Sequence, residues 1–506
     1  MCVLLLHRMD GPSKLLALPD PCLLAVLQGL ASEDQRSLFC AARAHSRLHQ
    51  AAVVALHSIK VHVGEQQQMD SVLLYLDKYG QHVDSIHLVG MEWGAVTLCQ
   101  LPSHLQLSSL QLELLHLQLQ PGNGSHGVLG AAAVAALKQL RLSHCELLDG
   151  EEQLAAALLQ LPAWLEHLSI VGVTADEVWV GFPTNALQRL QQLTYLELAE
   201  VTLQGCGQGQ PARQPLQALT HLQDLRLCTG NGAITTSVLS GTHHLTRLEL
   251  SGEHTDDGVY LFEPGVLAGK TQLRHLQLAY CRVLGDQAGV ARLMSHLWGL
   301  PQLTHLNVWH SVLAFAEGNP SAATFSALRA ISKLQHLGLC GCTLPVGVWQ
   351  HVFPAGRQLP HLKHLNISTV THPGAHFAAP PEGRQLVSCC PSLQSLDIQW
   401  LPHEADLLPA LQGLSGLHTL RLNADGVHGV CRLTGLRALS VHFPYFNRTG
   451  SELFGKELLL ELTQLRQLTA LTYIGAFCGR RRTICLTAAV SWAVMSRFPW
   501  VLAVSG

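Results

Sequence analysis

The sequence predicts an α/β solenoid, in which short parallel strands alternate with helical return segments. Leucine fills 98 of the 506 positions, and many of these leucines recur in one six-residue pattern at intervals of 19 to 31 residues. Charged residues make up only 13% of the chain, against about 25% in an average soluble domain. Because a single repeat cannot bury its own apolar side, a chain of this composition gains its core by stacking one repeat on the next.

The first element, residues 15–56, carries a helical pattern that differs from the rest of the chain. Asp20 is a good capping residue for a helix that begins at Pro21. The apolar face of this helix consists of Leu23, Leu24, Leu27 and Leu30. A capping box from Ser32 to Gln35 predicts the start of a second helix, and a third is expected from Ser46 to Leu56. Three such short helices make a small core, so we expect them to lean on a partner or on the repeats.

The order of residues in this segment resembles an F-box. The matching positions are Leu18-Pro19-Asp20, Leu23-Leu24, Val26-Leu27, Leu30, Asp34, Leu38, Arg43 and Arg47-Leu48. The chain departs from the family at His45, where a Trp is common, and at Ala41-Ala42, where a Val-Cys pair is common. The resemblance implies binding to a Skp-type adaptor of a cullin-RING ligase. The residues implied in that contact are Leu18, Pro19, Leu23, Leu24, Leu27 and Leu30. The alternative is a plain helical cap for the solenoid.

Residues 57–82 join this segment to the repeats and are expected to be a linker and capping segment. They contain a strand-like run from Ile59 to Val63 and a helix-like run from Ser71 to Tyr79.

The repeats occupy residues 83–475. The string L-x-x-L-x-L, with Ile or Val allowed last, begins at Leu137, Leu165, Leu193, Leu222, Leu245, Leu273, Leu303, Leu334, Leu362, Leu393, Leu417 and Leu436. Weaker copies begin at Val83, near Leu107 and at Leu468, which gives about 15 coils. Within each copy leucine alternates with polar residues, as in a strand with one buried face. The return segments, such as residues 150–159, are rich in Ala and Leu and predict helices.

This pattern resembles the leucine-rich repeat family. The resemblance implies a horseshoe with parallel strands on its concave side and helices on its convex side. Cys145, Cys281 and Cys342 fall three residues after the last strand leucine. Repeats of this family commonly place Asn or Cys there to bond the backbone of a turn, so we expect a structural role for these cysteines.

The third, fifth and seventh strand positions point away from the buried leucines, so we expect them on the concave face. One group of coils carries mixed charge there, at Tyr195, Glu197, Asp224, Arg226, Arg247 and Glu249. The coils that follow carry no formal charge, at His275, Gln277, His305, Asn307, Trp309, His336, Cys340, His364 and Asn366. Trp309 is the outstanding residue because exposed Trp is enriched at binding hot spots. Its alternative is to pack over its own turn on His310 or Val312.

We therefore expect a protein or peptide partner on the concave face. The candidate contact residues are His275, His305, Asn307, Trp309, His336, His364, Arg226 and Glu197. Because the four stacked imidazoles would repel one another once protonated, we expect binding to weaken below about pH 6.

Other classes of site are not expected. The histidine column is straight and offers a metal at most two neighbouring ligands, where zinc needs three or four. Residues 122–127 match GxGxxG, but the next strand is a repeat strand and not part of a nucleotide-binding sheet. Residues 264–271 resemble a P-loop but lead into a strand, where a P-loop opens a helix. A net charge of −3 gives no basic face for nucleic acid. With no nucleophile motif either, we expect neither an enzyme nor a cofactor.

The compartment and the C-terminus are read from composition. Fifteen cysteines without a CxxC pair, in a chain too long to need disulfides, indicate reduced thiols in the cytoplasm or nucleus. Residues 476–506 depart from the repeat. Arg480–Arg482 precede an apolar run that would suit a membrane tail anchor, but Arg497 disfavours it. A capping segment or a misassigned last exon is the alternative.

The function expected from these patterns is substrate recognition in an SCF-type ubiquitin ligase, with the F-box on the adaptor and the repeats on the target protein. The alternative is a repeat scaffold without adaptor binding, cytoskeletal or in the ciliary axoneme.

Overall fold

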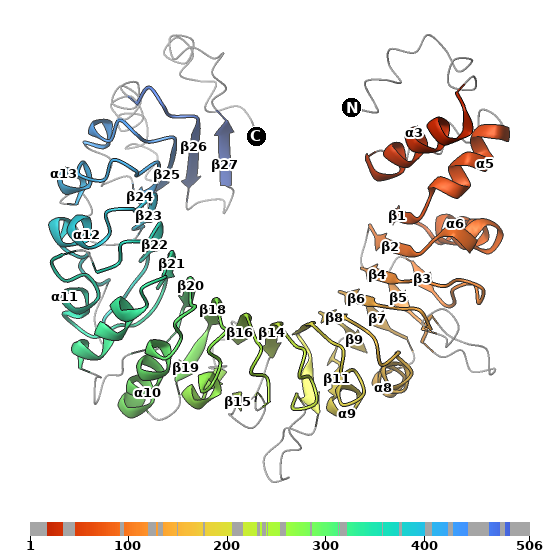
Figure 1. The fold of residues 1–506 in the computed structure, drawn as a ribbon, viewed down its shortest axis with the longest axis horizontal. Helices are drawn as coiled ribbons and strands as arrows, with labels where there is room; N and C mark the ends of the chain where they lie inside the picture. The colour runs from red at the N-terminus through yellow and green to blue at the C-terminus, as the bar shows by residue number, and fades with distance from the viewer. Residues whose placement is uncertain are drawn as a thin grey trace. The chain divides into compact units, whose positions relative to one another are not determined.

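The computed structural model describes the residue ranges 18–33, 46–91, 96–119, 128–129, 135–148, 150–175, 178–204, 216–229, 233–234, 239, 241–252, 260–283, 286–311, 313, 321–356, 358–373, 377–399, 407–423, 429–443, 465–475 and 481–485. The chain divides into two compact units. The first comprises residues 1–231 and 237–244, and the second comprises residues 232–236 and 245–506. Within each unit, parallel strands line one side, and the helices and turns that connect them line the other (Figure 1).

In the first unit the main sheet runs in sequence order. Its strands are β1 (Ser58–Val63), β2 (Ser85–Gly90), β4 (Ser109–Glu113), β6 (Gln139–Ser143), β8 (His167–Val171), β12 (Tyr195–Ala199) and β14 (Asp224–Thr229). Short strands behind it are β3 (Thr97–Leu98), β5 (His116–Leu117), β7 (Glu146–Leu147), β9 (Thr174–Ala175), β10 (Val178–Trp179), β11 (Gly181–Pro183) and β13 (Thr202–Gln204). The helices are α3 (Asp20–Glu33), α5 (Ser46–Ala55), α6 (Gln66–Tyr79), η1 (Gly80–His82), α8 (Glu151–Leu159) and α9 (Thr184–Leu187).

The second unit repeats this plan and carries the candidate site. Its parallel strands are β16 (Arg247–Gly252), β18 (His275–Ala279), β20 (His305–Trp309), β21 (His336–Gly338), β22 (His364–Asn366), β23 (Ser395–Asp397), β24 (Thr419–Asn423), β25 (Ala438–Phe443) and β26 (Ala470–Gly475), and β27 (Arg481–Cys485) pairs antiparallel with β26. Behind them lie β15 (Ala233–Ile234), β17 (Tyr260–Phe262) and β19 (Cys281–Val283). The helices are η2 (Pro264–Leu267), α10 (Asp286–Trp298), η3 (Ala322–Ala330), α11 (Val348–Val352), α12 (Gly383–Cys389), α13 (Leu408–Leu411) and η6 (Val430–Arg432).

The repeated leucines form the core, which confirms the leucine-rich repeat solenoid. In β18 the burial of side chains alternates, with Leu276 and Leu278 buried and His275 and Gln277 partly exposed. Neighbouring strands pair in register, so that Leu276 stands beside Leu306. Each leucine therefore packs on the equivalent leucine of the next coil, as expected when one repeat buries the apolar side of another.

The repeat cysteines have the structural role expected of them. Cys145, Cys281 and Cys342 are buried. The Cys145 thiol donates to the carbonyl oxygen of Leu112 at 3.4 Å, and the Cys342 thiol donates to that of Val308 at 3.0 Å. Each thiol thus satisfies a backbone acceptor from the strand of the preceding coil, where an unpaired buried carbonyl would cost free energy.

The N-terminal helices differ in part from the expectation. Helix α3 begins at Asp20 and continues through Glu33, so Ser32 does not open a second helix. Helix α5 begins at Ser46 as expected. Asp20 accepts a hydrogen bond from Arg47 Nη2 at 2.5 Å, which ties the start of α3 to α5. The expected second helix otherwise lies outside the described residues.

Residues 57–82, expected to be a linker and capping segment, form a strand and a helix that join the sheet. Strand β1 pairs with β2 in parallel over its full length, and α6 follows with Met69 and Leu76 buried. The strand-like run from Ile59 to Val63 is thus part of the sheet, and its buried positions, Ile59 and Val63, are not leucines of the repeat string.

Candidate binding groove

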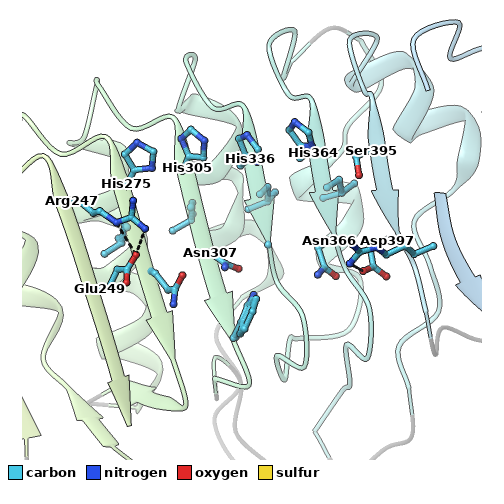
Figure 2. Close-up of a pocket in the computed structure, with 18 residues that line it drawn as sticks. Arg247, Glu249, His275, His305, Asn307, His336, His364, Asn366, Ser395 and Asp397 are labelled. Atoms are coloured by element: carbon cyan, nitrogen blue, oxygen red, sulfur yellow. Dashed lines mark hydrogen bonds and ion pairs between the residues drawn. The ribbon is translucent and has the colours of Figure 1, made fainter. Parts of the chain in front are cut away.

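Four histidines form a row of stacked rings on the polar face of the second unit. His275, His305, His336 and His364 are register partners on β18, β20, β21 and β22. The centroids of successive rings lie 4.1, 4.0 and 4.0 Å apart, with interplanar angles of 23°, 17° and 9°. The predicted column is therefore present, and Figure 2 shows the four rings side by side at one height above the strands.

The row lies along a groove of about 330 Å³. Its lining residues are Arg247, Glu249, His275, Leu276, Gln277, His305, Leu306, Asn307, Trp309, His336, Leu337, Gly338, His364, Leu365, Asn366, Ser395, Asp397 and Arg421. Six of the eight residues predicted to contact a partner are among them, namely His275, His305, Asn307, Trp309, His336 and His364. The structure thus brings these six candidate residues together in one groove, and their contact with a partner stays a prediction.

The imidazoles of His305 and His336 are neutral at physiological pH. Burial, together with the neighbouring imidazoles, lowers the pKa of His305 to about 4 and that of His336 to about 4. Burial also lowers the pKa of His364. Burial, the largest cause, keeps His305 and His336 uncharged to a lower pH than the sequence suggested, so we now expect their protonation to weaken binding near pH 4 and not below about pH 6.

Trp309 lies at the exposed end of β20. It is 40% exposed and lines the groove. Its backbone carbonyl accepts from Tyr280 N–H at 2.9 Å and from the Ser311 hydroxyl at 2.9 Å. The backbone of Trp309 is therefore fixed by the adjacent turn, while its side chain borders the groove.

Charged pairs stand at both ends of the groove. At one end the Arg247 guanidinium bonds Glu249 through two nitrogens (Figure 2). At the other, Arg421 Nη1 lies 3.5 Å from Asp397 Oδ2. Burial raises the pKa of the Asp397 carboxyl, and Arg421 opposes that rise.

Besides the strand leucines Leu276, Leu306, Leu337 and Leu365, the sequence missed four residues that line the groove. They are Gly338, Ser395, Asp397 and Arg421. The signal was available for three of them, because Ser395, Asp397 and Arg421 occupy the third and fifth positions of the repeats that begin at Leu393 and Leu417. Gly338 has no side chain that a sequence pattern could single out, and its role depends on Asn307, whose side chain lies next to it.

Glu197 and Arg226 belong to a separate charged network in the first unit. Glu197 accepts from the Ser169 hydroxyl at 2.6 Å and from the Tyr195 hydroxyl at 2.9 Å. Arg226 lies 3.4 Å from Asp224 and 4.0 Å from Glu197. The structure thus places these two predicted contact residues in a network of internal partners outside the groove.

The residues implied in adaptor binding do not form one exposed stripe. Leu23 and Leu27 are buried with Leu48 of α5, so they hold the helical pair together. Pro19 is exposed, and Leu18 and Leu24 are half-buried. The side chain of Leu30 lies outside the described residues. Leu23 and Leu27, two of the residues implied in adaptor binding, are therefore covered by the chain itself.

Among the described residues, no group of three or more His, Cys, Asp or Glu side chains is placed to hold a metal ion. Within the same part of the chain, none of the helices has the length and apolarity to cross a membrane. Lys270 of the P-loop-like segment is buried and leads into β18, and the GxGxxG segment lies outside the described residues. The apolar run after β27 lies outside them too.

Comparison with known proteins yields likenesses of fold. No protein-family model matches the chain, and no curated protein matches its sequence. It is similar to a leucine-rich repeat protein of Leptospira interrogans, with 15% identity and a TM-score of 0.48, over 81% of this chain and 90% of the other. It is also similar to an internalin of Listeria monocytogenes, with 15% identity and a TM-score of 0.38, over 71% of this chain and 92% of the other. The plant peptide hormone receptor RGFR1, solved in complex with RGF2, has 14% identity and a TM-score of 0.43 over 83% of this chain, which spans 63% of that receptor chain.

Proposed function

We propose that this chain is a non-catalytic recognition protein whose groove binds a segment of a partner protein. The observation that carries the proposal is the groove itself, in which a partly exposed Trp borders a row of neutral rings and amide side chains. Trp side chains at such positions dominate binding energy in many interfaces. The stacked imidazoles face one another and do not converge on a common atom, which favours a contact surface over a catalytic centre.

The test is binding of peptides selected from a random displayed library against the full chain. Trp309→Ala should weaken the selected peptide by about 2 kcal/mol or more. The matched control is Trp298→Ala, because Trp298 ends α10 and is 69% exposed outside the groove. Equal affinities for both variants and the wild type would remove the groove from the proposed function.

We propose further that the N-terminal helices bind a Skp-type adaptor, which would make the chain the substrate-recognition subunit of an SCF-type ubiquitin ligase in the cytoplasm or nucleus. Support comes from the packed pair α3 and α5, whose core of Leu23, Leu27 and Leu48 leaves Pro19 exposed and Leu24 half-buried. The second candidate function is a repeat scaffold, cytoskeletal or in a cilium, that uses the same groove without an adaptor.

Co-purification of a Skp-type adaptor with the full chain separates these two functions. Leu24→Asp should abolish capture, whereas Leu74→Asp, at a 70% exposed Leu of α6, should leave it unchanged. Leu27→Asp is unsuitable because it would unfold the helical pair. A wild-type chain that captures no adaptor would favour the scaffold.

A further inference from the structure

Two asparagines of the groove, Asn307 and Asn366, occupy the same register position on strands two apart. Asn307 on β20 and Asn366 on β22 both pair in register with Gly338 on β21, which lies between them. All three residues line the groove. Figure 2 shows the two amides at one level along the strands, apart from the row of rings. Because Gly338 has no side chain, the two amides have no side chain of that register row between them.

The amide of Asn366 is held in one orientation by the residue two positions further along the chain. Asn366 Oδ1 accepts from the Ser368 N–H at 3.0 Å and from the Ser368 hydroxyl at 2.6 Å. A backbone N–H can only donate, so the amide atom that it meets is the oxygen. The amide nitrogen of Asn366 has no hydrogen-bond partner among the described residues, and it is not buried. Asn366 therefore presents N–H donors to the groove.

The amide oxygen of Asn307 is turned over Gly338. Asn307 Oδ1 is buried, and it lies 2.2 Å from the point where a Cβ atom of Gly338 would stand. The space that the glycine leaves open is thus occupied by the oxygen of the neighbouring amide. In the part of the chain that the structure describes, the amide nitrogen of Asn307 also lacks a partner and is not buried. Asn307, like Asn366, therefore offers the groove a donor and not an acceptor.

The distance between the two amides follows from the spacing of the strands. Neighbouring strands lie about 4.8 Å apart. Because Asn307 leans over the intervening strand, its amide is separated from that of Asn366 by more than one strand step and less than two, which is about 5 to 10 Å. In an extended chain the carbonyls on one side recur at every second residue, about 6.6 Å apart. One extended segment that lies across the strands can therefore offer a carbonyl to each asparagine.

The acceptors that suit these donors are neutral and evenly spaced. Asp397 is the register partner of Asn366 on β23, so an anionic acceptor would lie beside a carboxylate. Backbone carbonyls are uncharged, and every residue of a partner segment supplies one. Deepening the protein-binding role proposed above, on which this step rests, we propose that Asn307 and Asn366 bind the backbone of an extended partner segment, each donating to one of two carbonyls that are two residues apart. Selection among partner sequences is then the role of Trp309.

The first experiment removes carbonyls from the ligand and leaves the protein unchanged. The probe is the peptide selected from the displayed library on the full chain. It is synthesised as a series in which one peptide bond at a time is replaced by a trans-alkene, which has no carbonyl oxygen, and binding is measured by fluorescence polarisation. Two replacements, two residues apart, should each weaken binding about threefold to tenfold, the value of a neutral hydrogen bond. A series without such a pair would overturn the backbone site, while the effect of Trp309→Ala would still decide the proposed function.

Two variants then assign each carbonyl to its donor. Asn366→Asp keeps the oxygen that accepts from Ser368 and loses only the N–H donors, and Asn307→Asp makes the same change on β20. Each variant should weaken the unmodified peptide at least about threefold. Each should also abolish the effect of one alkene replacement, a different one for each variant. The matched control is Gln350→Glu, the same change from amide to carboxylate at an exposed position of α11 outside the groove, which should bind as the wild type does.

The outcomes separate this inference from the proposed function. If both variants bound more weakly but both alkene replacements kept their full effect, the added charge alone would explain the loss and the backbone site would be wrong. Unchanged binding by Asn307→Asp and Asn366→Asp would overturn it as well. If no peptide were selected whose binding depends on Trp309, the proposed function would fail, and the backbone site with it.

Discussion

At the scale of single residues, the two faces of each strand have different energetic roles. Leu276 is buried between coils, whereas its neighbour His275 is partly exposed and stacks on His305. Leu276→Ala should therefore lower the free energy of unfolding by about 2 to 5 kcal/mol. His275→Ala should cost about 0.5 to 1.5 kcal/mol, the value of one aromatic contact. Denaturant unfolding of both variants checks the assignment, and a larger loss for His275→Ala would mean that the faces are reversed.

Gly338 is a second residue with a specific role. A Cβ atom at this position would lie 2.2 Å from Asn307 Oδ1. That oxygen is buried and has no hydrogen-bond partner among the described residues. Gly338→Ala should thus force Asn307 to move into the groove, reduce binding of a selected peptide, and cost about 1 to 3 kcal/mol of stability.

The control for Gly338→Ala is Gly416→Ala, where the nearest atom to a new Cβ is the Leu393 carbonyl oxygen at an ordinary 3.5 Å. Peptide affinity and thermal unfolding are measured for both variants. If the two behaved alike, the close approach of Asn307 to Gly338 would have no bearing on the groove.

At the scale of elements, the sequence predicted the strands well and the turns poorly. The strands were predictable because two-residue alternation with leucine at fixed positions has a single structural solution. The turns were not, because the residue after many strands is left-handed without being Gly, as at Tyr280, His310 and Thr369. Its N–H donates to the next coil, for example from His310 to the Cys340 carbonyl at 2.9 Å. This backbone hydrogen bond to the next coil thus compensates for a left-handed conformation that residues other than Gly disfavour.

The titration of His305 and His336 makes the stability of the folded protein depend on pH. The pKa of His305 and that of His336 are each lowered to about 4 in the folded protein, against about 6.5 in an unfolded chain. Below pH 6.5 the unfolded state takes up protons that the folded state does not, so stability is highest above pH 6.5 and falls as the pH drops toward 4.

Thermal unfolding between pH 7 and 4.5 tests this dependence. The wild type should lose stability across the range, and a variant carrying His305→Gln and His336→Gln should lose less, because it lacks the two groups that titrate. Peptide binding that depends on His305 and His336 should be the same at pH 5 as at pH 7, since these two rings are still neutral in the folded protein. Identical pH profiles for the variant and the wild type would assign the loss to other groups.

At the scale of the whole molecule, the sequence predicted one uninterrupted solenoid from residue 83 to 475. The structure has the expected coils but divides them into two compact units, and its sheet begins at Ser58. Repeat strings report which residues are buried between neighbours, and this is why they located His275 to His364 correctly. They carry no information on where the chain divides into compact units, or on which polar side chains of adjacent coils meet, as Asp397 and Arg421 do.

Coupling between neighbouring coils also predicts how far the destabilising effect of a core substitution extends along the chain. In a repeat protein, stability is approximately a sum of terms for each repeat and its immediate interfaces. Leu306 is buried in β20 and stands in register with Leu276 of β18 and Leu337 of β21. Leu306→Ala should therefore increase amide hydrogen exchange in these three strands, because local opening costs less free energy there. Exchange in β6 and β8 of the first unit should stay at the wild-type rate. Exchange is measured by mass spectrometry of proteolytic fragments. An equal increase in exchange in both units would show that the chain opens as one cooperative body and not coil by coil.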